Sequence, residues 1–137
     1  MNHFNERFQI SDAELAALNS EADAIQEYMD RASDIRDGNV LTERLHTLDT
    51  YMSRLSEMMI RAKTMKAQEQ NAYLAVNEEK INKLTATVSN RMLASHLFEH
   101  SATYERLETM YHTVEHLTRD LVTQISYLKK QLESFGS

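Results

Sequence analysis

The last third of this chain carries an unbroken apolar repeat in which the spacing alternates between three and four residues. This spacing places all members on one face of a helix, and Thr118 is the only polar one. The members are Tyr104, Leu107, Tyr111, Val114, Thr118, Leu121, Ile125, Leu128, Leu132 and Phe135. A stripe about nine turns long cannot bury itself, so it must pack against another helix of comparable length.

The composition favours helix almost throughout. The 137 residues include no proline and two glycines, the residue types least tolerated inside helices. The absence of cysteine excludes disulfides and cysteine-based metal or nucleophile chemistry. No apolar run exceeds five residues, far short of the roughly 20 that cross a membrane. The sequence therefore predicts a cytoplasmic protein with no membrane contact, too small for an enzyme cleft plus its scaffold.

The predicted fold class is all-α, a coiled-coil-like bundle formed by a single domain over residues 11–137. Ser11 and Glu14 form a capping box that predicts a helix start, so residues 1–10 are expected to be a flexible leader. The expected helices are 11–36, 40–80, a short segment at 86–95, and 96–134. A second apolar stripe supports the long middle helix and consists of Leu41, Leu45, Leu48, Met52, Leu55, Met59 and Ala62. We expect this helix and the last one to form a long antiparallel hairpin, with the N-terminal helix packed alongside.

The stripe of the last helix is longer than the N-terminal helix that would help to cover it. Part of the stripe therefore remains for a partner, and we expect a homodimer or a higher oligomer. The residues expected along the oligomer seam are Leu107, Val114, Leu121, Ile125, Leu128 and Leu132.

Charge is divided unevenly along the chain. The net charge of −6 lies entirely within residues 1–37, which hold nine acidic and three basic residues, whereas residues 38–137 hold twelve of each. Residues 61–91 are locally basic. The acidic arm and the basic middle can attract each other within or between chains, or both can be ordinary solvated helix faces.

The basic middle is also a candidate site for an anionic ligand. Cations and aromatic rings near the closed end of a hairpin suit a phosphate-bearing small molecule or a single nucleic-acid strand. The candidate residues are Arg61, Lys63, Lys66, Tyr73, Lys80, Lys83, Arg91, Tyr104 and Arg106. Their basic excess is well below that of a dedicated nucleic-acid binder, so nucleic acid is not the favoured ligand.

Two segments have the form H-x-x-E-H, in which two histidines four residues apart on a helix can chelate one zinc ion. The histidines are His96 and His100 in the first segment, and His112 and His116 in the second. A catalytic zinc also needs a third protein ligand and a dry cleft, which a bundle of this size scarcely provides. We interpret all four as solvated histidines and expect no catalytic metal and no cofactor, with a His-based metal site as the weaker alternative.

The sequence LVTQISYLK at residues 121–129 resembles an ending of the form L-R-x-x-I-S-x-x-K. Upstream residues that follow in a similar order are Tyr73, Glu78, Lys80, Glu99 and Tyr104. Over residues 45–133 the chain is thereby similar to a group of small all-helical proteins of tailed phages and prophages, found beside genes for single-stranded DNA annealing and binding proteins. Val122 stands where that pattern has arginine. The resemblance implies a phage accessory protein that acts by binding, in the cytoplasm of the bacterial host.

Together these features predict a non-enzymatic, self-associating helical protein that acts stoichiometrically. With the phage resemblance, the expected role is to sequester or inhibit a host defence component or a nucleotide-type signal. The expected partners are therefore a second copy of the chain and a host protein or a phosphate-bearing small molecule. Two alternatives stay open: an accessory protein of phage single-stranded DNA recombination or replication, and a His-based metal-binding protein.

Overall fold

Helices account for nearly all of the chain in the computed structural model, which describes the backbone of residues 2–31 and 37–136 and the side chains of residues 11–31 and 37–135. The five helices are α1 (Asn2–Asp30), α2 (Gly38–Val76), α3 (Glu78–Asn82), α4 (Ala86–His96) and α5 (Phe98–Gly136). No strand occurs within the described ranges. The predicted all-α fold class is confirmed.

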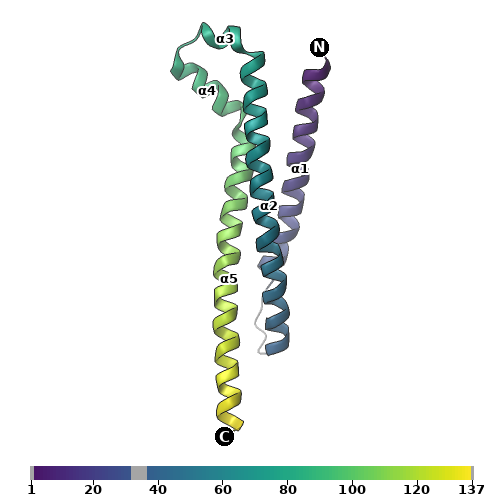
Figure 1. Cartoon of the computed structure of the whole chain (residues 1–137), viewed down its shortest axis with the longest axis vertical. Helices are drawn as coiled ribbons and strands as arrows, with labels where there is room; N and C mark the ends of the chain where they lie inside the picture. The colour runs from purple at the N-terminus through teal and green to yellow at the C-terminus, as the bar shows by residue number, and fades with distance from the viewer. Residues whose placement is uncertain (1, 32–36, 137) are drawn as a thin grey trace.

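The two long helices α2 and α5 run antiparallel, side by side, as Figure 1 shows. The short helices α3 and α4 close this hairpin at one end. Helix α1 lies alongside, antiparallel to α2, and contacts both long helices. At the other end α5 continues past the start of α2, so the C-terminus projects beyond the rest of the molecule. The predicted hairpin with an added N-terminal helix is therefore the observed architecture.

The first helix begins earlier than the capping box predicted. Helix α1 starts at Asn2 and so includes most of the segment expected to be a leader. The Ser11 side chain does not cap it, because a hydrogen bond of 3.0 Å joins Ser11 Oγ to His100 Nε2 of α5. The predicted helix start at Ser11 is wrong because helical backbone already runs from Asn2, so Ser11 lies inside α1 and its hydroxyl contacts His100 instead.

Polar side chains define the other helix ends near the closed end of the hairpin. Asn77, rather than a residue near position 80, ends α2, and its side-chain amide donates to Tyr73 O at 2.9 Å. Thr85 caps α4 by accepting a hydrogen bond from the Val88 N–H. Leu97 interrupts the helix expected from residue 96, with φ −92° and ψ 4°, so α4 and α5 are separate helices.

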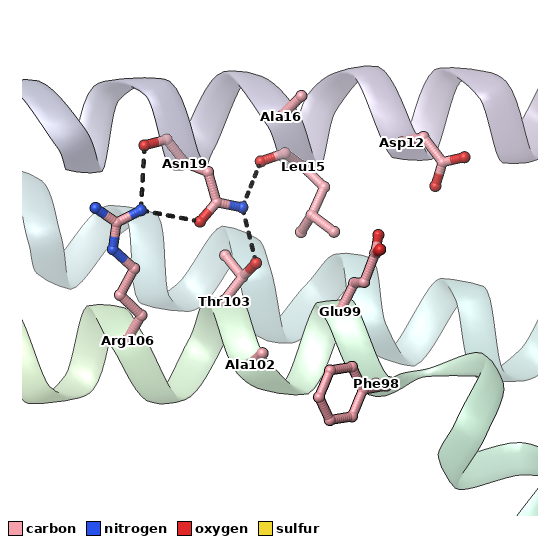
Figure 2. A pocket seen from close by; sticks show the side chains of 9 residues that line it. All are labelled: Asp12, Leu15, Ala16, Asn19, Phe98, Glu99, Ala102, Thr103 and Arg106. Carbon is pink, nitrogen blue, oxygen red and sulfur yellow. Dashed lines mark hydrogen bonds between the residues drawn. The ribbon is translucent and has the colours of Figure 1, made fainter.

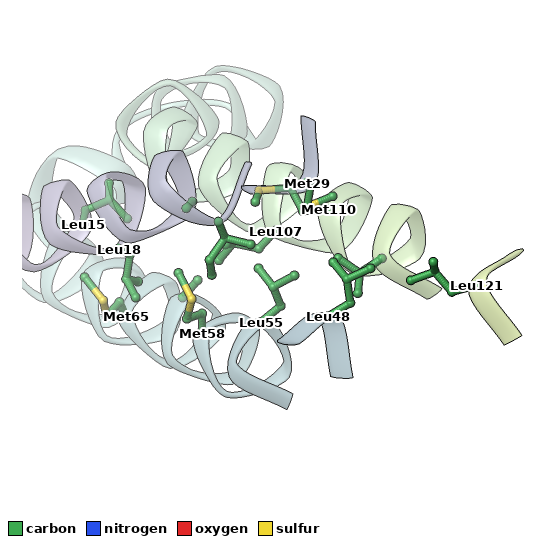
Figure 3. Close-up of a cluster of buried hydrophobic side chains, with 14 of the residues drawn as sticks. Leu15, Leu18, Met29, Leu48, Leu55, Met58, Met65, Leu107, Met110 and Leu121 are labelled. Atoms are coloured by element: carbon green, nitrogen blue, oxygen red, sulfur yellow. The ribbon is translucent and has the colours of Figure 1, made fainter. Parts of the chain in front are cut away.

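The core forms where the stripes of α2 and α5 meet a third stripe from α1 (Figure 3). Full burial of one leucine side chain stabilises the fold by about 1.5–3 kcal/mol. The buried core side chains of the three helices are Leu15, Leu18, Ala22, Ile25, Met29, Leu41, Leu48, Leu55, Met58, Ala62, Met65, Leu107, Met110, Val114 and Leu121. Met58 is buried and Met59 only half-buried, since α2 packs against two helices and its buried face is wider than one seam.

In the part of the chain that the structure describes, no helix combines the length and the apolar character needed to cross a membrane.

Truncation of Leu55 tests this core. Leu55 has no exposed surface, so we expect Leu55→Ala to lower the free energy of unfolding by about 2–5 kcal/mol, from lost burial and the cavity left behind. Urea denaturation followed by circular dichroism measures the change. Ile60→Ala is the matched control, because Ile60 lies on the same helix and is 66% exposed, and its effect should stay within about 0.5 kcal/mol. Equal losses for the two variants would contradict the three-helix core.

Candidate functional site

Two of the predicted anion-binding residues instead hold α1 in place. Arg61 forms an ion pair with Glu14. Arg106 donates to Asp23 Oδ1 at 2.6 Å and to Asn19 Oδ1 at 3.2 Å. The acidic arm and the basic middle therefore attract each other within one chain, and these two cations are neutralised by α1.

A third arginine, absent from the predicted anion site, makes a similar contact with α1. Arg54 Nε and Nη2 donate to the two carboxylate oxygens of Glu21 at 2.6 and 3.0 Å, and Nη1 donates to Glu57. The hydrogen bonds to Glu21 and then Glu57 raise the pKa of the Arg54 guanidinium. The two-point geometry fixes the register of α1 on α2, although half-exposed ion pairs add little stability.

The other predicted anion-binding residues are spread over four helices and the turn after α3. Lys63, Lys80, Lys83 and Arg91 are exposed. Lys66 is half-buried beside a hollow of about 480 Å³ between α2, α4 and α5. The two aromatic residues pack inside the protein: Tyr73 is buried and Tyr104 lies against the core. With Arg61 and Arg106 paired to α1, the described residues do not bring the nine candidates together into one basic site.

A groove of about 340 Å³ lies between α1 and α5, and Figure 2 shows its lining. Asn19 spans it, donating to Thr103 Oγ1 at 2.9 Å and to Leu15 O at 3.1 Å, while Arg106 donates to its side-chain oxygen. Both amide hydrogens and the oxygen of Asn19 are thereby satisfied within the chain. The groove is a contact between two helices in which Asn19, Thr103 and Arg106 bond to one another.

A buried polar cluster lies where α2, α4, α5 and α1 meet. His96 Nε2 donates to Glu69 Oε1 at 2.8 Å, and Glu69 is only 6% exposed. The Tyr73 ring packs against the His96 imidazole with centroids 4.5 Å apart. His100 is 4% exposed and reaches Ser11 of α1. Glu69 occupies a stripe position of α2, so a polar group there needs a partner from a neighbouring helix.

The two histidines of the first H-x-x-E-H segment thus differ from the prediction. His96 is half-buried and His100 is buried, so neither is the solvated residue we expected. The break at Leu97 places them on different helices, which removes the continuous helix that the chelating geometry requires. His112 and His116 are exposed on α5, as expected of solvated histidines.

The polar cluster resembles a catalytic arrangement only in its residue types. A Ser–His–acid triad needs one imidazole that contacts the hydroxyl through one nitrogen and the acid through the other. Here Ser11 contacts His100 and Glu69 contacts His96, so the two pairs are separate. Within the described part of the chain, His100 Nδ1 is buried without a hydrogen-bond partner, so no acid described there orients this ring. Among the described residues, no group of three or more histidine, cysteine or acidic side chains is arranged to hold a metal ion.

The stripe of α5 changes from buried to exposed along the helix. Of the predicted oligomer-seam residues, Leu107, Val114 and Leu121 are buried within one chain. The exposure of the stripe then rises through half-buried Ile125 and Leu128 to Leu132 (72%) and Phe135 (89%). Only the last part of the predicted seam therefore remains available to a partner.

Comparison with known proteins gives no match, whether to a protein-family model, to a curated protein or to a solved structure.

The Glu69–His96 pair gives a test of the polar cluster. We expect His96→Ala to lower the free energy of unfolding by about 1–3 kcal/mol, because a buried carboxylate loses its hydrogen-bond donor. Urea denaturation at pH 7 measures the loss. His96→Ala combined with Glu69→Met should recover most of it, since an apolar side chain needs no partner. His112→Ala is the exposed control, and a denaturation curve of His96→Ala that matches this control would contradict the expected role of the pair.

Proposed function

We propose that this protein is a non-catalytic, self-associating helical binding protein that acts by stoichiometric association. The observation that supports the proposal best is the apolar stripe of α5, which continues past the end of the bundle core. Leu132 and Phe135 are largely exposed, although they continue the repeat whose earlier members, Leu107 and Val114, are fully buried.

The arrangement of these side chains supports association more than their hydrophobicity alone. Single exposed apolar residues are common on protein surfaces and need no explanation. Here Ile125, Leu128, Leu132 and Phe135 share one helix face at the 3-4 spacing of a coiled-coil seam. A helix with matching spacing would bury all four, and the burial of one such side chain contributes up to about 1.5–3 kcal/mol.

The remaining features of the molecule support structural roles for the other candidate sites. Arg61 and Arg106 pair with acidic residues of α1, and the groove between α1 and α5 has its central polar groups satisfied within the chain. Within the proposal, the narrower role is sequestration of a host component by a phage protein, and it rests on the resemblance to phage proteins alone.

The mass of the protein in solution tests the proposal. We expect native mass spectrometry and light scattering to show a mass above that of one chain, rising with concentration, because Leu132 and Phe135 become buried on association. The double variant Leu132→Ser, Phe135→Ser should have the mass of one chain at the same concentrations and unchanged helicity. Tyr127→Ser is the matched control, since Tyr127 is 62% exposed on α5 but points away from the stripe.

A single-chain mass for the unaltered protein at every concentration up to several hundred micromolar would overturn the proposal. Dissociation of the control variant as readily as the double variant would also overturn it, since the stripe would then not be the contact surface.

A further inference from the structure

We infer that two copies of this chain associate tail to tail, with residues 122–135 of each α5 pairing antiparallel about a two-fold axis. We name residues 122–135 the α5 tail. The inference rests on the proposed function and identifies the first partner of the apolar stripe as a second copy of the same chain.

The repeat of the α5 tail is continuous with an interface that is already formed. From Val114 to Leu121 the stripe is buried against the other helices of the same chain, and Figure 3 places Leu121 at the end of the core cluster. Ile125, Leu128 and Leu132 continue that stripe in the same register. The occupant that fits is therefore a helix with the same 3-4 spacing, which a second α5 tail provides.

The neighbouring helices leave room for this occupant at one end of the bundle. Arg44 of α2 donates to Met29 O at 3.3 Å, which places the end of α1 beside the first turns of α2. Between the end of α1 and the C-terminal pole, α2 is the only described helix that covers α5. Beyond the first residue of α2, Gly38, no described helix covers α5. Among the described residues, none of α1 continues into the place beside α2 and α5 at this end, and a helix arriving from the projecting end would lie there (Figure 1).

The direction of pairing follows from the position of α2. Helix α2 already covers the α5 stripe from its first turn onward. A parallel partner on the same stripe would place its own bundle in the space that α2 occupies. An antiparallel partner extends away from the projecting end, so the two bundles lie on opposite sides of the paired tails. The contact is then isologous and closed, with each tail covering the other.

Charge complementarity favours a second copy as well. The α5 tail carries Lys129 and Lys130 against Glu133. The start of α2, which a partner's tail would pass, carries three exposed acidic residues, Asp37, Glu43 and Asp49. The one arginine of that segment, Arg44, is held over the Tyr28 ring at 5.3 Å and bonded to α1. The tail is therefore net positive and the start of α2 net negative, but Glu43 and Asp49 lie about 100° and 140° round α2 from Arg44, which faces α1. Their attraction for the tail acts through solvent, and salt reduces it.

The size of the contact predicts a reversible dimer. An aromatic side chain buries about 150–250 Å² when covered. Mutual burial of Phe135, Leu132 and the half-buried seam residues of two tails removes on the order of 1,000 Å² from water, which is at the lower limit of a specific interface. We therefore expect dissociation on dilution within the range that solution methods reach.

Intermolecular distances between spin labels test the pairing. Because the chain has no cysteine, single-cysteine variants carry one label each. Gln124→Cys, Gln131→Cys and His116→Cys place labels on exposed side chains of α5. In an antiparallel pair, the distance between the two copies of one residue depends on how far that residue lies from the two-fold axis. Each residue farther from the axis adds about 3 Å, because each helix contributes its rise of about 1.5 Å. We expect short distances at Gln124 and Gln131 and a distance at His116 longer by roughly 25 Å.

The possible outcomes separate the inference from the proposed function. Equal short distances at all three positions would mean parallel pairing, and long distances at all three in a sample of dimeric mass would mean association elsewhere. Either result overturns the tail-to-tail pair and leaves self-association standing, whereas a single-chain mass overturns both. Adding Leu132→Ser to Gln124→Cys should raise the dimer dissociation constant at least about tenfold, and adding Tyr127→Ser should leave it unchanged.

Discussion

The seam between α2 and α5 is the contact on which the rest of the structure depends. Leu48 and Leu55 on one helix and Leu107 and Val114 on the other have no exposed surface, and together they hold two long helices antiparallel. Helix α1 lies in the groove that this pair creates. Its ion pairs fix its register, but half-exposed pairs contribute little free energy, so the docking of α1 depends mainly on the apolar groove.

The architecture was predictable because a 3-4 repeat specifies both the helix and the side of it that must be covered. The ends of the helices were less predictable. The sequence around Ser11 carries a good local cap signal, yet the hydroxyl serves a contact with His100, which lies 89 residues away in the chain. The break between the last two helices was expected between residues 95 and 96 and lies at Leu97, where no glycine or proline marks its exact position. Both features depend on how helices meet in space, which spacing along one helix does not contain.

For the polar cluster too, the residue types are visible in the sequence, whereas their partners depend on the tertiary structure. Glu69 continues the 3-4 spacing of the α2 stripe past Ala62, but the polar sequence around it does not predict the burial that the structure shows. Its donor is His96 at the end of α4, and α4 reaches α2 only because the chain turns back through α3. The basic middle was likewise visible as an excess of charge. The acids that neutralise Arg61 and Arg106 lie on α1. Which cations are paired therefore depends on the register of α1 against the hairpin.

Helix α5 projects at one pole of the molecule, and α3 and α4 lie at the other, so a tail-to-tail pair would be long. Helix α5 has 39 residues and is therefore about 60 Å long. Two chains joined at their C-terminal poles form a rod with a hairpin turn displayed at each extremity, facing opposite ways. Any target recognised at that turn would be met twice at a fixed separation, so the rod would gain avidity only where two linked copies of the target lie at that spacing.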